Sequence, residues 1–308
     1  MPMGEGHRAP GLDEILERDQ WASALGPYES LGQRFRLLVS DAVLAAWLDT
    51  LYGPMRVVEP DVGAPSDHDR PAVTFRIVAP TQGRAGAVVR GDELMGTSLQ
   101  PSRIMALLQW SLNRRVIETA CVDRLVLHAG CVAHDGAALV LAGRMEAGKS
   151  TLTAGLLDLG FEYLTDEAVA VAEDLTVEGY AKPLSLDPGS WSTLPHLEPD
   201  VPDELHPYLA QQWQVGVSAV DQSVNPQRLQ ALVLTRYQAD APTTCEPAPP
   251  RWALAELAHC TFVPEGQVLP AERIHELAHL IEVVPAFRMV VGDLASAARA
   301  VTDIVLRR

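Results

Sequence analysis

The sequence contains few cysteines and no long apolar segment. Its four cysteines, Cys121, Cys131, Cys245 and Cys260, lie far apart and form no C-x-x-C pair. No stretch of about 18 apolar residues occurs, so no membrane-spanning helix is expected. The first residues lack the basic segment followed by an apolar run that marks a signal peptide. We therefore predict a cytoplasmic protein whose cysteines are reduced thiols.

Positive charge is also scarce. The chain has 24 lysines and arginines against 40 aspartates and glutamates, which gives a net charge of −16 and a pI near 4.9. A protein that binds nucleic acid by neutralising phosphates is expected to be basic, so a nucleic-acid partner is not predicted. The same excess of negative charge argues against binding to anionic membranes.

The length favours two domains. At roughly 150 residues per domain, 308 residues with 47% hydrophobic content can form two parts with a sizeable core. We place the boundary near residue 120, with an accessory α/β module over 1–120 and a second α/β domain over 121–308. The expected elements of the first part are a helix over 12–25, strands over 34–39 and 72–78, a loop over 61–70, a hairpin over 83–99 and a helix over 101–120.

The second part alternates strands and helices, which predicts an α/β layer. The expected strands are 125–128, 137–142, 168–172, 229–237 and 286–291. The expected helices are 150–159, 251–259, 270–283 and 294–306. Residues 187–227 contain many prolines and are expected to be rich in loops, and residues 239–250 are expected to form a proline-rich loop.

The most specific motif is a phosphate-binding loop. Residues 143–150 read GRMEAGKS and fit G-x-x-x-x-G-K-[ST] at every fixed position, between an apolar strand and an apolar helix. In such a loop, glycines let backbone N–H groups surround an anion at a helix N-terminus. The lysine reaches the β- and γ-phosphates, and the serine hydroxyl binds Mg²⁺. The predicted nucleotide-binding residues are Gly143, Arg144, Met145, Glu146, Ala147, Gly148, Lys149, Ser150 and Thr151.

Five segments, read in order, resemble the HPr kinase/phosphorylase family and most closely its shorter HPr-kinase-like relatives. They are LHAGCVAHDG (127–136), LAGRMEAGKSTL (141–152), GFEYLTDEAVAV (160–171), KPLSLDPGSW (182–191) and VVPAFRMVVGDL (283–294). The resemblance implies a P-loop kinase domain that uses ATP and Mg²⁺. The glycine-containing segment associated with the family's reverse reaction is missing, so a kinase is implied more than a bifunctional enzyme.

The resemblance also implies roles for four residues. Asp166 and Glu167 fall on paired acidic positions, of which one holds Mg²⁺ and the other accepts the proton of the attacking hydroxyl. The usual second residue is aspartate, so the sequence leaves open which carboxylate is the base. His128 matches a histidine near the transferred phosphoryl group, and Arg236 matches an arginine that meets a phosphate. A solvated strand end, a core histidine and a surface ion pair are the corresponding structural alternatives.

The predicted function is transfer of the γ-phosphate of ATP to a serine or threonine hydroxyl of a peptide or protein. In this mechanism Asp166, Glu167, His128 and Lys149 are catalytic, and Ser150 and Asp166 hold Mg²⁺. Some of the shorter relatives accompany peptide natural-product pathways, which suggests a precursor peptide as acceptor. Larger family members form rings, so the resemblance allows a homo-oligomer. The alternatives are an ATP-binding regulator that transfers no phosphate and a kinase for a small-molecule hydroxyl.

A second motif points to different chemistry. Residues 275–279 read HELAH, the H-E-x-x-H pattern of zinc proteases, in which two histidines share one helix face. A catalytic zinc site needs a third protein ligand. Glu282 and Pro285 occupy the positions where the extended motif needs Gly and His, and no glutamate follows Glu282. We therefore expect a structural helix here.

Overall fold

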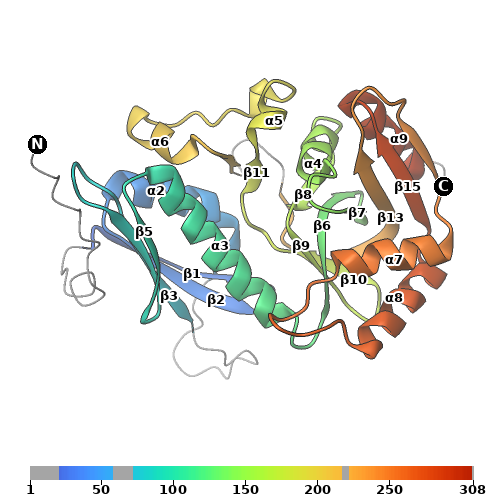
Figure 1. Ribbon diagram of the computed structural model, residues 1–308, viewed down its shortest axis with the longest axis horizontal. Coiled ribbons are helices and arrows are strands. Elements are labelled where there is room, and N and C mark those ends of the chain that lie inside the picture. Colours follow the sequence, from blue (N-terminus) through green and yellow to red (C-terminus); the bar gives the residue numbers. More distant parts are fainter. Residues whose placement is uncertain (1–20, 58–71, 217–221, 307–308) are drawn as a thin grey trace, which may run out of the picture.

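The computed structural model describes residues 21–57, 72–216 and 222–306 of the chain. Within these ranges the protein has a mixed α/β fold with two large sheets, and Figure 1 shows them side by side. The first sheet comes from the N-terminal part of the chain, and the second from the part after α3. A separate two-stranded ribbon pairs β11 with β12.

The first sheet has five strands in the order β1-β2-β3-β4-β5. All neighbours are antiparallel except β2 and β3, which are parallel. Helices α2 and α3 pack on one face, where Leu48 and Leu108 share a core with Phe35 and Phe75. The bounds are β1 Ser23–Ser30, β2 Gln33–Val39, α2 Ala42–Tyr52, η1 Gly53–Met55, β3 Val73–Val78, β4 Gly86–Arg90, β5 Glu93–Ser98 and α3 Pro101–Ala120.

The second sheet has eight strands, with β10-β9-β6-β7-β13-β15-β14 along its main path and β8 beside β6. Its centre is parallel, because β13 pairs in parallel with both β7 and β15. The strands are β6 Leu125–His134, β7 Ala137–Ala142, β8 Glu162–Thr165, β9 Ala168–Val171, β10 Thr176–Gly179, β13 Gln227–Tyr237, β14 Thr244–Pro247 and β15 Ala286–Val291.

Helices cover both faces of this second sheet. Leu152 of α4 and Val301 of α9 share one core with the sheet, and Leu257 of α7 and Leu277 of α8 share another. The two helix pairs lie above and below the sheet in Figure 1. Their bounds are α4 Lys149–Leu157, α7 Pro250–Cys260, α8 Ala271–Val283 and α9 Leu294–Leu306.

A segment of short elements leaves the second sheet, packs against α2 and α3, and returns to the second sheet at β13. It follows the second sheet's strand β10, and in Figure 1 it passes over α2 and α3. Stacked Trp191 and Trp213, with ring centroids 4.8 Å apart, lie within it. The bounds are β11 Leu184–Leu186, α5 Pro188–Trp191, η2 Pro195–Leu197, η3 Asp203–Leu205, α6 His206–Leu209 and β12 Trp213–Val215.

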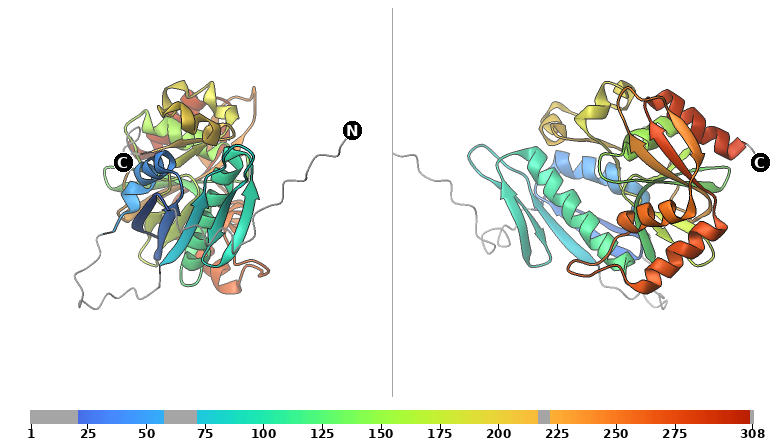
Figure 2. Two further views of the ribbon diagram at one scale, coloured as in Figure 1. Left: turned by 90° about the vertical axis from the view of Figure 1, so that its left-hand side faces the viewer. Right: turned by 45° about the vertical axis from the view of Figure 1, so that its right-hand side comes forward.

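One hydrophobic core runs from the first sheet into this segment. It joins Phe35 and Leu48 to Tyr163, Tyr180 and Leu186, all of which are buried. The views in Figure 2 agree that the two parts are packed together. The chain passes from the first sheet to the second between the end of α3 and the start of β6, and the hydrophobic core continues across this point. The division into two domains stays a prediction.

Most of the expected elements are present, including the hairpin over 83–99 and the helix over 101–120. The expected helix over 12–25 lies largely outside the described residues, and its last part is strand, because β1 begins at Ser23. The loop expected over 61–70 also lies outside the described residues. Strand β14 occupies part of the expected loop over 239–250, because its residues pair with β15.

Two further expectations concern cysteines and membranes. All four cysteines lie in the described ranges, and none forms a disulfide. No helix in the described ranges is long and apolar enough to cross a membrane.

Candidate functional site

Three strand ends meet at one edge of the eight-stranded sheet. Because β7, β13 and β15 are parallel, their carboxyl ends, at Ala142, Tyr237 and Val291, lie at the same edge. Open α/β sheets place ligands in the crevice outside such ends. A cavity of about 730 Å³ lies here. Its lining comprises His128, Met145 to Leu152, Asp166, Glu167, Ser185, Asp187, Gly189, Ser190, Thr193, Gln212, Tyr237 and Val291 to Leu294.

The loop after β7 has the backbone shape of an anion site. Glu146 and Gly148 have positive φ angles of 63° and 81°, which turn the chain sharply before α4. A Cβ at Gly143 would lie 2.6 Å from the Thr235 carbonyl oxygen, so only glycine fits there. Helix α4 begins at Lys149 without a side-chain cap. The N–H groups of its first turn therefore have no partner within the helix and can bind an anion.

The Lys149 side chain closes this loop. Its Nζ donates to the carbonyl oxygens of Gly143 at 2.9 Å and Arg144 at 3.0 Å. The residue is only 7% exposed, and burial lowers the pKa of the Lys149 ammonium group. These two hydrogen bonds hold the Lys149 side chain against the loop, where it lines the cavity.

Asp166 and Glu167 form the turn between β8 and β9. The Thr165 hydroxyl accepts a hydrogen bond from the Glu167 N–H at 3.1 Å and fixes the turn. Strand β9 pairs with β6 so that Ala168 lies opposite His128. This register brings His128 Nε2 to 4.0 Å from Glu167 Oε1. A carboxylate and an imidazole thus face the cavity together.

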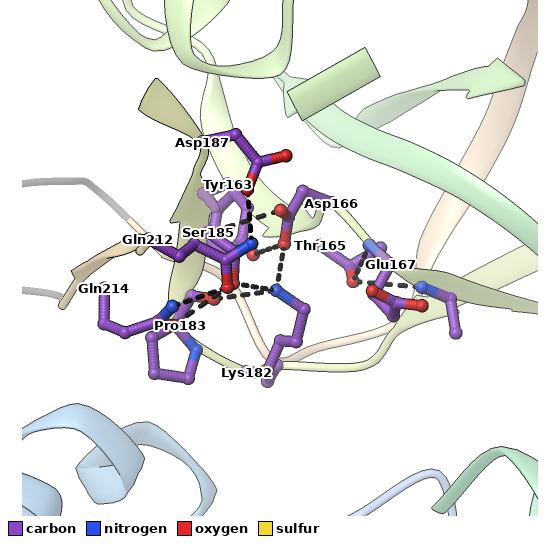
Figure 3. Close-up of polar contacts among 12 residues, drawn as sticks. Tyr163, Thr165, Asp166, Glu167, Lys182, Pro183, Ser185, Asp187, Gln212 and Gln214 are labelled. Atoms are coloured by element: carbon purple, nitrogen blue, oxygen red, sulfur yellow. Dashed lines mark hydrogen bonds and ion pairs between the residues drawn. The ribbon is translucent and has the colours of Figure 1, made fainter. Parts of the chain in front are cut away.

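The Asp166 carboxylate is held by several donors. Its Oδ1 accepts from Tyr163 Oη at 2.8 Å and from Lys182 Nζ at 2.6 Å, and its Oδ2 accepts from the Ser185 N–H at 3.2 Å. Figure 3 shows these contacts converging on the carboxylate. Asp166 is 4% exposed and Lys182 is 3% exposed, so this is a buried ion pair. Such a pair needs its further hydrogen bonds to offset the cost of desolvation.

Lys182 was assigned no role by the sequence reasoning, although it lies in the segment KPLSLDPGSW. Composition held a usable signal: the chain has only two lysines, Lys149 and Lys182, and the other 22 of its 24 basic residues are arginines. Both lysines are buried beside the Asp166–Glu167 turn. Ser185, Asp187, Gln212 and Asp293 also line the cavity without having been singled out.

Burial shifts the pKa values of His128 and Glu167, which face each other in the cavity. Burial, with a smaller contribution from the Lys149 charge, lowers the pKa of His128 to about 4, so this imidazole is neutral at pH 7. Burial also raises the pKa of the Glu167 carboxyl, while the Lys182 charge opposes that rise. A carboxylate with a raised pKa is a better proton acceptor than an ordinary surface glutamate.

The structure brings most of the predicted residues together. His128, Lys149, Ser150, Asp166 and Glu167 all line the cavity, as do Met145, Glu146, Ala147, Gly148 and Thr151. Three predicted residues lie outside the lining. Gly143 is buried at the start of the loop, Arg144 is exposed and pairs with Glu256 at 3.5 Å, and Arg236 is exposed next to the lining residue Tyr237. Their contact with a nucleotide stays a prediction.

The H-E-x-x-H pattern lies elsewhere, on α8. His275, Glu276 and His279 are exposed, and Glu276 pairs with Arg273 at 2.8 Å. The buried side chains of this helix are Leu277 and Leu280. In the described ranges, no group of three or more histidine, cysteine, aspartate or glutamate residues could hold a metal ion.

Comparison with solved structures finds a weak likeness. Among solved structures, the HPr(Ser) kinase/phosphatase from Coxiella burnetii is similar, with 15% identity and a TM-score of 0.30 over 59% of this chain and 97% of that chain. No family model and no curated protein matches the chain. At this level of similarity, neither a fold family nor a function of this chain follows from the likeness.

Proposed function

We propose that the protein is an ATP-dependent phosphotransferase that phosphorylates a hydroxyl group of a peptide or protein. The observation that supports this most is a single cavity whose lining includes the 145–152 loop, the Asp166–Glu167 turn and His128. Phosphoryl transfer requires a phosphate cradle and a proton acceptor in one place. A regulator that only binds nucleotide needs the cradle alone.

The residues present fit ATP and Mg²⁺. The uncapped first turn of α4 and the Lys149 ammonium group suit the phosphates, as described above. The Ser150 hydroxyl and the Asp166 carboxylate are the hard oxygen donors that Mg²⁺ prefers. Bound Mg²⁺ would neutralise charge on the phosphate oxygens. Asp166 already accepts three hydrogen bonds, which leaves about one of its roughly four lone-pair sites for the ion.

The contacts favour Glu167 over Asp166 as the base. Asp166 is committed to Tyr163, Lys182 and Ser185, whereas Glu167 faces neutral His128 at 4.0 Å. In the proposed step the acceptor oxygen bonds to the γ-phosphorus while the bond from that phosphorus to the β–γ bridging oxygen breaks. The hydroxyl proton passes to Glu167, and ADP leaves. His128 orients Glu167 or donates to a phosphate oxygen.

Calorimetry with Mg²⁺ and ATP tests the nucleotide part of the proposal. The wild-type protein should bind ATP, and Lys149→Ala should bind it too weakly to measure, because one buried cation that faces the phosphates is lost. Arg251→Ala is the matched control, since it removes one exposed positive charge on α7. Equal affinity in wild type and Lys149→Ala would refute the proposal.

The two lysines allow a second test. Amine-selective acetylation followed by mass spectrometry has only Lys149, Lys182 and the chain's amino terminus to report. Mg²⁺ and ATP should slow the acetylation of Lys149, because the phosphates would cover its Nζ. Acetylation of Lys149 at an unchanged rate would contradict binding in this cavity.

A further inference from the structure

A second cavity adjoins the proposed active site. It has a volume of about 200 Å³ and lies between α3 and the segment that carries α6 and β12. Two of its lining residues, Asp187 and Gln212, also line the larger cavity. Gln212 Nε2 donates to Asp187 Oδ1 at 2.8 Å, so this hydrogen-bonded pair forms the shared wall.

The lining of the second cavity is rich in amide groups. It contains Gln109 from α3 together with Gln211, Gln212 and Gln214. Gln109 is half-buried and Gln211 is exposed, and no hydrogen bond within the part of the chain that the structure describes involves either side chain. A glutamine side chain offers one acceptor and two donors, the same groups that a peptide bond needs as partners. The free amides are therefore suited to a peptide backbone.

The charges of the two cavities differ. The larger cavity combines carboxylates, Asp187 among them, with the Lys149 ammonium group and the uncapped first turn of α4, which suit phosphates. The lining of the smaller cavity contains the Asp187 carboxylate but no lysine or arginine to offset it. An anion would meet this carboxylate and a protein of net charge −16. The smaller cavity therefore suits a neutral or basic ligand and not a second phosphate group.

Hydrogen bonds connect the shared wall to the Asp166 carboxylate. Gln214 donates to Gln212 Oε1 at 2.8 Å and accepts from the Ser185 hydroxyl at 3.1 Å, and Lys182 donates to that hydroxyl at 2.8 Å. Figure 3 shows this chain from Lys182 to Asp187. Every donor in it points from Lys182 toward Asp187, which fixes the wall between the cavities in one arrangement.

We infer that the smaller cavity is the acceptor subsite, and that it binds a neutral or basic peptide segment next to the hydroxyl that is phosphorylated. This inference rests on the proposed function. The acceptor lies along α3 with its backbone against the glutamine amides, and its hydroxyl passes the Asp187–Gln212 wall into the larger cavity. There it meets the γ-phosphate, and Glu167 takes its proton as ADP leaves. Helix α3 thus gives the N-terminal part of the chain a role in choosing the acceptor.

Substitutions at two positions of α3 test the subsite without touching the larger cavity. Ala106 is exposed and lines only the smaller cavity, so Ala106→Trp fills it, and Ala106→Ser is the matched control that leaves it open. Gln109 also lines only the smaller cavity. Gln109→Lys and Gln109→Glu place opposite charges there on side chains of similar reach.

The experiment measures two quantities for each variant. The first is the affinity for Mg²⁺ and ATP by calorimetry. The second is kcat/KM for transfer of labelled phosphate from ATP to a panel of serine-centred peptides flanked by alanine, lysine or glutamate. Ala106→Trp should lower kcat/KM about tenfold or more without changing ATP affinity, and Ala106→Ser should resemble wild type.

The charge variants at Gln109 give the more specific test, because they change which peptide is preferred. Wild type should prefer lysine-flanked to glutamate-flanked peptides, Gln109→Glu should increase that preference about two- to fivefold, and Gln109→Lys should reduce it by as much. Peptide kinetics unchanged in Ala106→Trp, or a parallel loss of ATP affinity, would overturn the inference. ATP binding with no phosphate transfer to any peptide would overturn it too, while leaving the nucleotide site intact. Failure of wild type to bind ATP would instead overturn the proposed function and the inference with it.

Discussion

The two sheets bury their strands in different ways. In the five-stranded sheet, β2 alternates buried and more exposed residues, because α2 and α3 cover one face of that sheet. In the eight-stranded sheet, all but the first residue of β7 are buried, because helices cover both faces. Parallel strands are usually covered in this second way.

This difference explains why the candidate site belongs to one sheet. Parallel strands direct their carboxyl ends to one edge, and there loops from β7, β13 and β15 meet. The five-stranded sheet has a single parallel pair, β2 and β3, and no strand residue of this sheet lines the cavity. Its contribution reaches the site area through α3, which supplies one side of the smaller cavity.

The largest predicted effect tests whether the two sheets are energetically separate. Phe35→Ala removes a ring that is fully buried in the core common to both parts. Such a truncation costs about 3–5 kcal/mol in the free energy of unfolding. Urea unfolding followed by tryptophan fluorescence should show one cooperative transition, shifted to lower urea. Arg84→Ala, in an exposed turn, is the control and should leave the midpoint unchanged.

Two separate transitions, of which only the first moves in Phe35→Ala, would show that the parts unfold independently. In that case the two sheets would belong to two autonomous domains.

The next prediction concerns the edge where the parallel strands end. Glu167→Gln keeps the shape of the side chain and removes its charge, so phosphate transfer should fall about 10²- to 10³-fold. ATP affinity should stay near that of wild type, since the loop and Lys149 are unchanged. Glu173→Gln, exposed in the β9–β10 turn, is the matched control. Unchanged turnover in Glu167→Gln would disprove its assignment as the base.

Local patterns predicted the elements that depend on local sequence. The hairpin over 83–99 was recognisable from its turn at residues 90–92, and the helix over 101–120 from the proline at its start and its helical spacing. Helix α2 was missed although its buried Leu44, Leu48 and Leu51 have helical spacing, because its exposed face also carries apolar residues, among them Val43 and Ala46. Its start was nevertheless marked, since the Asp41 side chain accepts from the Leu44 N–H as an N-cap.

The candidate site also has one part that local sequence predicts and one part that it does not. The loop over 143–150 is one contiguous motif, and its spacing alone identified it. The Asp166–Lys182 ion pair joins residues 16 positions apart, and only the packing of β11 beside the β8–β9 turn brings them together. Strand β14 likewise depends on a partner, β15, that comes some 40 residues later in the chain. Such contacts follow from tertiary structure, and a short motif does not encode them.

A smaller effect is expected from pH. His128 has a folded-state pKa of about 4, against about 6.5 in an unfolded chain, because it is buried near Lys149. As pH falls from 6.5 toward 4, the unfolded chain takes up a proton that the folded protein does not, so stability is lost. Because the side chain is partly exposed, we expect this loss to be about 1–2 kcal/mol.

Denaturant unfolding at pH 7 and pH 4.5 measures this loss. His128→Gln should lose less stability between the two pH values than wild type does, because it has no imidazole to protonate. An equal loss in both proteins would mean that the His128 imidazole is solvated. That result would contradict its burial in the cavity at the edge of the eight-stranded sheet.

The smallest effect is predicted for the other histidine motif, and it separates sequence pattern from position. His275 and His279 are exposed on α8, which packs on the face of the eight-stranded sheet opposite α4. Neither histidine lines the cavity. His275→Ala should change the free energy of unfolding by no more than about 0.5 kcal/mol, as is usual for an exposed position. Phosphate transfer should stay intact, and metal analysis of the purified wild type should find no stoichiometric zinc. EDTA should stop transfer only by removing Mg²⁺, and added Mg²⁺ should restore it.

His128→Ala, by contrast, should lower transfer sharply with little change in ATP affinity, because it removes the imidazole that faces Glu167. Bound zinc together with an inactive His275→Ala protein would reverse the assignment, because activity would then depend on the exposed helix and not on the edge of the sheet.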